Sequence, residues 1–261
     1  MMAGSCCIEF AKPEQTPKTI ALLKSRFILL SFLLFRPLWG ILPVALRYQG
    51  GFHVIQGTAP AKIPGEWERW VEERRLKGYM GETSKAKNRR IREGFFETYC
   101  PEDRSGVDIG CSDDPLNHTF RRWDITFGDG DATDMAGVPD ETFFTVYASH
   151  VLEHLQYPAK AVRRWYEICK KGGHIIICVP NRDLYERKRF PPSNWNEEHK
   201  HFWLPDAEDP PSTKCLRKVI LEAVPSANIV SYRTIDEGCD YTISKNEHPI
   251  GEYTIEAIIK K

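Results

Sequence analysis

Carboxylates follow short apolar runs at three places between residues 106 and 132. Asp108 and Gly110 close the first run, and glycine lets the backbone turn tightly and approach a ligand. Asp124 ends a second run, and Asp131-Ala132 lies in the turn-rich segment that follows. At the carboxyl ends of strands in an open α/β sheet, such groups can bind an amino group, the hydroxyls of a ribose and the edge of an adenine. The pattern therefore predicts a site for a nucleoside that carries an amino group.

The glycine-rich fingerprint of dinucleotide sites is absent from the segment after Gly110. Ser112 and Pro115 stand where the later glycines of G-x-G-x-x-G would fall. These glycines bring the backbone close to a pyrophosphate, so their absence disfavours NAD and FAD. A ligand without a pyrophosphate suits the segment better.

Two histidines lie on the segment Ser149–Leu155, which we expect to be a helix after the third strand. His150 and His154 are four residues apart and would share one face of that helix. Histidine can accept a proton from an acceptor hydroxyl near neutral pH, so both are candidate catalytic residues. Core or capping histidines are the alternative. Glu153 and His154 alone are too few ligands for a metal ion, and no metal is expected.

A long segment, residues 181–211, follows an apolar run that ends at Pro180. It mixes acidic, aromatic and histidine side chains, among them Tyr185, Glu186 and His199. Long loops at the ligand edge of an α/β sheet are usually functional, and this mixture could hold the face and hydroxyls of a sugar. A structured insertion without ligand contact is the alternative.

The elements that must position these residues alternate along the chain after Ser105. Apolar runs predict strands, and amphipathic stretches predict helices between them. The expected strands are 106–109, 121–125, 143–148, 174–179, 229–234 and 253–259, and the expected helices are 149–155, 159–170 and 214–223. Gly172-Gly173 is expected to end the helix that begins at 159. Such alternation indicates an α/β fold with a mostly parallel sheet covered on both faces.

Four segments together resemble class I S-adenosylmethionine (SAM)-dependent methyltransferases, most closely the methyltransferase type 11 group. They are VDIGCSDDP, WDITFGDGDATDM, FTVYASHVLEHL and KKGGHIIICVPN, in this order. The resemblance implies a doubly wound, Rossmann-like sheet of seven strands with helices on both faces and an antiparallel last strand. It departs from the family pattern at Ser112 and Asp113, where a further glycine is usual.

The resemblance also implies roles for the carboxylates. Asp108 and Gly110 would lie at the methionine end of SAM, Asp124 at the ribose, and Asp131 with Ala132 at the adenine. The expected set of cofactor-binding residues is completed by Cys111 and Ser149. The segments DLYE and N-x-x-H-K, from Asp183 onward, resemble methyltransferases of polysaccharide biosynthesis clusters.

We therefore expect an enzyme that transfers a methyl group from SAM to an oxygen or nitrogen of a small-molecule or glycan acceptor. Methylation of a protein or nucleic acid, or a non-catalytic SAM-binding partner protein, are the alternatives. Basic and acidic residues number 36 each, which argues against electrostatic attraction to nucleic acid, so no nucleic-acid partner is expected.

Three regions are expected along the chain. Residues 1–60 would form an N-terminal extension, 61–104 a helical cover, and 105–261 the methyltransferase domain. The apolar stretch 27–46 is interrupted by Arg36 and two prolines, which favours weak contact with a membrane surface or a partner over a spanning helix. A signal peptide and an over-extended translation start are the other readings of this stretch.

Charge and cysteine patterns complete the expectations. In the cover, Arg89, Arg90 and Arg92 would lie on a solvated face, or alternatively on a lid that meets a carboxylate or phosphate. The eight cysteines show no C-x-x-C pair or zinc spacing, which predicts reduced thiols in a cytoplasmic protein.

Overall fold

The computed structural model describes residues 81–261, which build a six-stranded sheet in the order β2-β1-β3-β4-β8-β7. β1 to β4 run parallel, and β8 is antiparallel to both β4 and β7. The strands are β1 (Gly106–Ile109), β2 (Arg121–Trp123), β3 (Phe143–Ser149), β4 (Cys169–Pro180), β7 (Asn228–Ile235) and β8 (Thr254–Lys260). The described residues thus give six strands in this sheet where seven were expected, while the antiparallel last strand agrees with the prediction.

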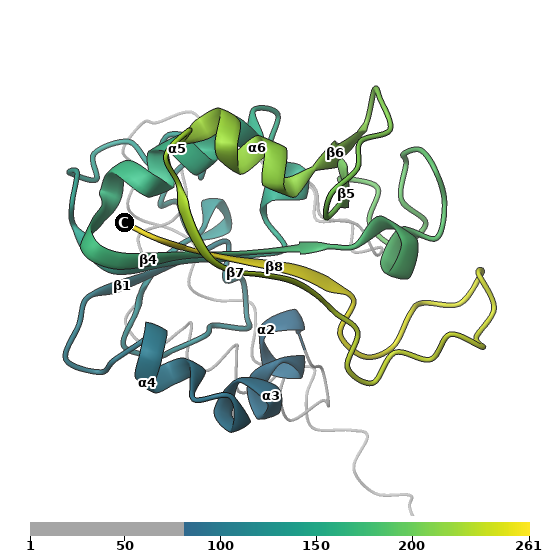
Figure 1. Ribbon diagram of the computed structural model, residues 1–261, viewed down its shortest axis with the longest axis horizontal. Coiled ribbons are helices and arrows are strands. Elements are labelled where there is room, and N and C mark those ends of the chain that lie inside the picture. The colour runs from purple at the N-terminus through teal and green to yellow at the C-terminus, as the bar shows by residue number, and fades with distance from the viewer. Residues whose placement is uncertain (1–80) are drawn as a thin grey trace, which may run out of the picture. The chain divides into compact units, whose positions relative to one another are not determined.

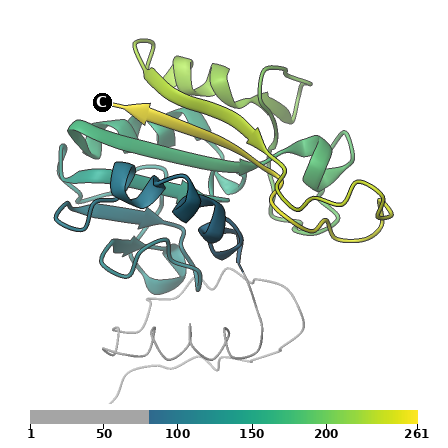
Figure 2. The same ribbon diagram turned by 60° about the horizontal axis from the view of Figure 1, so that its bottom comes forward.

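Helices cover both faces of this sheet (Figures 1 and 2). One face carries α5 (Pro158–Ile168) and α6 (Leu216–Ala223), and the other carries α2 (Glu82–Lys85), α3 (Lys87–Arg92) and α4 (Phe95–Tyr99). A separate two-stranded parallel sheet, β5 (Phe202–Leu204) and β6 (Thr213–Cys215), lies in the long segment before α6. Helices on both faces place the sheet between two apolar layers.

The larger apolar layer lies between the sheet and the pair α5 and α6. Ala161, Val162, Trp165 and Ile168 line one side of α5 and are all buried, as their helical spacing predicts. They pack against apolar side chains from the sheet, including the fully buried Ile177.

Two predicted element boundaries are wrong. The segment after β3 is a single 3-10 turn, η2 (Leu152–His154), because His150 takes a left-handed φ of 55° that interrupts a helix. Helix α5 ends at Ile168, and Gly173 lies inside β4 instead of ending the helix. A Cβ at Gly173 would lie 2.3 Å from the carbonyl oxygen of Phe144, so the close approach of β4 to β3 requires glycine there.

Buried charges tie α3 to the sheet. Glu256 on β8 has 0% exposure and pairs with Arg89 at 3.5 Å, Arg90 at 3.6 Å and Arg233 at 3.0 Å. Arg89 also donates to Glu252 through its Nη2 at 2.9 Å. A buried carboxylate is tolerated only when it is paired and hydrogen-bonded, and three guanidinium groups meet that need.

The expectation that Arg89 and Arg90 lie on a solvated face is therefore wrong. Both side chains are buried, and their partners are carboxylates of this chain. Arg92 alone of the three is exposed, and it pairs with the exposed Glu237. Helical spacing shows which residues share a face, but it cannot show that acidic residues far along the chain will meet them.

The remaining sequence expectations concern cysteines and the membrane. The six cysteines among the described residues are free, and five of them are buried. Within residues 81–261, none of the helices has the length and apolar character needed to cross a membrane. The stretch 27–46 and the proposed extension 1–60 lie outside the described residues.

Removing the Glu256 carboxylate should strongly destabilise the fold. We expect Glu256→Ala to lower the free energy of unfolding by about 3–5 kcal/mol, because Arg89 and Arg90 are left buried without their shared partner. The matched control is Glu237→Ala, which breaks the exposed pair with Arg92 and should cost about 0–1 kcal/mol. Urea unfolding followed by circular dichroism measures both. Equal losses in the two variants would show that the buried network does not hold the fold.

Candidate functional site

The residues with candidate chemistry gather along one edge of the sheet. The parallel strands β1, β2, β3 and β4 all end at this edge, and the antiparallel β8 begins there. The chain consequently brings the loops after each of these strands to the same side. Asp108, Asp124 and Ser149 stand at or near three of these strand ends.

The turn after β1 depends on Gly110. Its φ is 66°, and an added Cβ would lie 2.3 Å from a methyl carbon of Val151, so no other residue fits without rearrangement. The amide of Gly110 donates to the carbonyl of Trp123 at 2.7 Å, which joins this turn to the end of β2. Ser112, where the family pattern has a further glycine, also takes a left-handed φ of 45°. The conformation that glycine favours is therefore present without the glycine.

Asp124 connects the two loops that follow β1 and β2. Its side chain accepts from the amide of Ser112 at 2.9 Å and from the amide of Thr126 at 2.8 Å, and the Thr126 hydroxyl donates to it as well. A carboxylate offers about four acceptor positions, so at least one stays available. Reorientation of the Thr126 hydroxyl would free a second. This capacity suits a ligand that presents two neighbouring hydroxyls.

Asp108 is buried on the α4 side of β1. One carboxylate oxygen accepts from the amide of Leu116 at 2.7 Å. Burial raises the pKa of Asp108 to about 8, the negative charges of Asp114 and Asp124 add to the rise, and the charge of Arg90 opposes it. A cation bound beside this carboxyl group would lower its pKa again and favour the charged carboxylate.

The other predicted cofactor residues lie in the same loops. Asp131 is exposed and accepts from the amide of Thr133 at 2.7 Å, while the carbonyl of Ala132 accepts from the Trp165 indole at 2.9 Å. Cys111 is a buried thiol whose pKa is raised by burial, and Ser149 is half-buried at the end of β3.

The donor groups of SAM match these acceptors. SAM carries an ammonium group, two ribose hydroxyls and an adenine amino group, all of which donate hydrogen bonds. The buried Asp108, the partly satisfied Asp124 and the exposed Asp131 provide three carboxylates along one edge of the sheet. The acceptor groups of the chain therefore fit this cofactor.

His150 begins the loop beyond β3. Its Nε2 lies 3.2 Å from the hydroxyl of Thr254 on β8, and its Nδ1 lies 3.6 Å from a carboxylate oxygen of Glu153. Burial lowers the pKa of His150 to about 4, so the ring is neutral at physiological pH. Because η2 is a single 3-10 turn, His150 and His154 do not share a helical face as expected.

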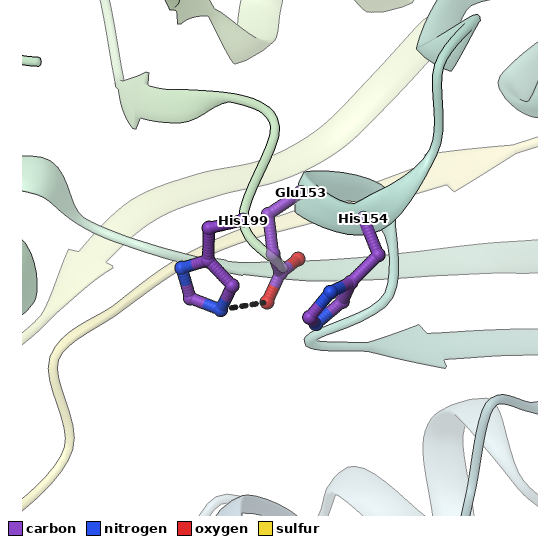
Figure 3. Close-up of side chains that lie close together, drawn as sticks. All are labelled: Glu153, His154 and His199. Carbon is purple, nitrogen blue, oxygen red and sulfur yellow. Dashed lines mark ion pairs between the residues drawn. The ribbon is translucent and has the colours of Figure 1, made fainter. Parts of the chain in front are cut away.

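The close-up in Figure 3 shows that η2 instead brings Glu153 and His154 toward His199 from the long loop. The Nε2 atom of His199 lies 3.9 Å from the Glu153 carboxylate, and its Nδ1 lies 2.6 Å from Glu186. Burial raises the pKa of Glu153 to about 7 and lowers that of His154 to about 3. Burial alone would lower the pKa of His199, but Glu186 and Glu153 raise it above its usual value.

Glu153, Glu186 and His199 were not among the predicted site residues. The signal for Glu186 and His199 is the unusual mixture of aromatic and ionisable side chains in the long segment after Pro180, and the signal for Glu153 is its place beside His154. Nothing in the sequence indicated that His199 would reach η2, because that contact joins loops far apart along the chain.

A short helix lies at the other side of His150. Glu82 and Lys85 of α2 meet Tyr253, whose hydroxyl donates to Glu82 and accepts from the Lys85 ammonium at 3.1 Å. The Tyr253 ring lies 6.0 Å from that of His150, edge to face. α2 therefore adds polar groups to the same edge of the sheet.

Comparison with solved structures finds similar chains at low sequence identity. A SAM-dependent methyltransferase from Archaeoglobus fulgidus is 19% identical, with 74% of this chain and 99% of that chain covered and a TM-score of 0.43. One from Thermotoga maritima is 16% identical, covering 75% of this chain and 95% of that chain, with a TM-score of 0.43. One from Aquifex aeolicus is 12% identical, covering 76% and 98% respectively, with a TM-score of 0.40.

A search of curated proteins finds no match. The family model described as a methyltransferase domain matches residues 64–209, more than half of the chain, and this range includes every predicted cofactor residue. This match decides the family of the chain. The cofactor of the enzyme is SAM. The chain therefore belongs to the methyltransferase domain family and is a SAM-dependent methyltransferase.

Proposed function

We propose that the protein transfers the SAM methyl group to an oxygen or nitrogen atom of a small-molecule or glycan acceptor. The observation that carries the proposal is the division of the sheet edge. Carboxylates suited to the cofactor follow β1 and β2, while His150, His154 and His199 lie beyond β3 and β4. An acceptor held on the second side would face the methyl donor held on the first.

On the cofactor side, each residue has a proposed role. Asp108 binds the ammonium group, with Gly110 and Cys111 forming the turn around the methionine end. Asp124 accepts from the ribose hydroxyls, and Asp131 with Ala132 binds the adenine edge. Ser149 completes this set from the end of β3. The unused acceptor capacity of Asp124 and the raised pKa of Asp108 support these roles.

A polar cavity supports a polar acceptor. It has a volume of about 660 Å³ and lies between the segment around Arg187 and the segment around Tyr241. The first of these segments also carries Glu186, the partner of His199. The cavity lining combines five basic and three acidic side chains with Tyr241 and several apolar residues, a combination suited to the hydroxyls, charged substituents and apolar face of a sugar. A glycan acceptor agrees with these groups.

The main task of the chain in this reaction is alignment. Bound SAM supplies an electrophilic methyl carbon, and holding it in line with an acceptor atom removes much of the entropic barrier. His150 and His154 stand on the acceptor side, and we propose that His150 accepts the proton when the acceptor is a hydroxyl. Its Nε2 already forms a hydrogen bond with a hydroxyl, that of Thr254, at 3.2 Å.

The ribose assignment is tested at Asp124. Asp124→Ala should weaken SAM binding by about 1.5–3 kcal/mol, which is roughly tenfold to a hundredfold, because a charged acceptor is lost. The control is Thr126→Val, which removes a donor to the same carboxylate but leaves the carboxylate in place. Its SAM affinity should be unchanged or higher. Calorimetry measures both, and an unaltered affinity in Asp124→Ala would remove Asp124 from the cofactor site.

The acceptor side is tested at His150. With radiolabelled SAM and fractionated cell extract as the source of acceptor, His150→Ala should lower turnover at least tenfold, because the acceptor loses its proton-accepting neighbour. SAM affinity should stay within about twofold, since no cofactor contact is removed. His118→Ala, a change at an exposed histidine, is the control and should transfer at the normal rate. Normal turnover in His150→Ala would refute the proposed role. Loss of SAM binding in that variant would place His150 on the cofactor side instead.

A further inference from the structure

Three side chains with metal-binding atoms converge where η2 meets the long loop. One ligand atom from each of Glu153, His154 and His199 lies within 4.8 Å of the other two (Figure 3). Glu153 and His199 are buried, and His154 is partly buried. A carboxylate and two imidazoles at this spacing form a compact set of ligands for one ion.

The carboxylate of Glu153 and the Nδ1 of His154 lack hydrogen-bond partners among residues 81–261. The rings of His150 and His199 approach the Glu153 carboxylate to 3.6 and 3.9 Å, which is beyond hydrogen-bond distance. Glu153 is fully buried, with 0% exposure. A buried carboxylate without a donor is costly, and native structures rarely leave one so. A cation between these atoms would satisfy all of them.

His199 is held in the orientation of a metal ligand. Its Nδ1 lies 2.6 Å from Glu186, which directs its Nε2 toward Glu153 at 3.9 Å. Histidines that ligate metals commonly donate their other ring nitrogen to a carboxylate in this way, and the partner fixes the tautomer of the ring.

The backbone around the group is fixed before any ion binds. The amides of Lys200 and His201 both donate to the carbonyl of Glu153, at 2.9 and 3.2 Å. The Lys200 ammonium donates to the carbonyl of His154 at 2.6 Å. These bonds hold the loop that carries His199 against η2, so the ligands need little rearrangement to meet one ion.

We propose that Glu153, His154 and His199 bind one divalent first-row transition-metal ion, with Glu186 orienting His199. Two imidazoles favour an ion such as Zn²⁺ or Fe²⁺ over Mg²⁺, which prefers oxygen ligands. Three protein ligands leave coordination positions for an oxygen of the acceptor. This last step rests on the proposed function, while the ion site itself does not. The site replaces the expectation that no metal is involved, because His199 supplies the ligand that Glu153 and His154 lacked.

The test uses the full chain after removal of metals with a chelator. Calorimetric titration with Zn²⁺ should show one ion bound per chain. Titration with Co²⁺ should give visible absorption bands without the near-ultraviolet charge-transfer band of a thiolate ligand. A strong thiolate charge-transfer band with one equivalent of Co²⁺ would overturn the proposal. The absence of Zn²⁺ binding at a Zn²⁺ concentration of about 1 mM would overturn it as well.

Variants locate the ion. His199→Ala and the near-isosteric Glu153→Gln should each weaken Zn²⁺ binding at least a hundredfold, and Glu186→Gln about tenfold, because an outer partner is lost. His201→Ala, a histidine on the same loop outside the group, should bind Zn²⁺ as the unchanged protein does. Equal Zn²⁺ affinity in His199→Ala and His201→Ala would overturn the site.

SAM titration of the same variants separates the two proposals. Retained SAM binding with lost Zn²⁺ binding supports the ion site and shows that the variants are folded. If His199→Ala does not fold, Glu153→Gln and the Co²⁺ spectrum of the unchanged protein decide. Intact Zn²⁺ binding with absent SAM binding in the unchanged protein would count against the cofactor site alone.

Discussion

The pairing of the buried Glu256 with arginines is the interaction on which the rest of the site depends. It joins β8, at the centre of the sheet's antiparallel part, to Arg89 and Arg90 of α3. Without these cations the carboxylate would be buried in the core with few partners, which is costly. Because α2 directly precedes α3, the same contact sets where Glu82 and Lys85 meet Tyr253. This buried network stabilises the fold. By placing α2, it also determines which polar groups lie near the acceptor side.

The edge of the sheet then separates two kinds of chemistry. On one side, carboxylates at different depths offer acceptors to a cofactor that is rich in donors. On the other, imidazoles and buried carboxylates share few donors among themselves, and among the described residues no donor lies within hydrogen-bond distance of the Glu153 carboxylate. The carboxylates of the first side need only the donor groups of SAM to complete their hydrogen bonds. The second needs a cation or a donor from the acceptor, which is why we place the ion beside the acceptor.

The sequence alone was sufficient for the features that arise locally. Apolar runs located the strands of the main sheet, and the four segments that resemble the methyltransferase family indicated the cofactor, because each of them is local in the sequence. Contacts between distant segments could not be predicted. The burial of Arg90 depends on Glu256, and the meeting of His199 with Glu153 depends on how a long loop closes. The left-handed φ at His150, which ends the expected helix, has no signal in the residue type.

The most direct test of the account is the pH dependence of SAM binding. Burial raises the pKa of Asp108 to about 8, with Asp114 and Asp124 adding to the rise and Arg90 opposing it. Below that pH the carboxyl must lose a proton before it can pair with the ammonium group of SAM. Affinity should therefore rise with pH, approaching tenfold per unit between about pH 6 and 7.5, and Asp108→Asn should abolish the slope. An affinity independent of pH, or the same slope in Asp108→Asn, would contradict the placement of SAM at this edge.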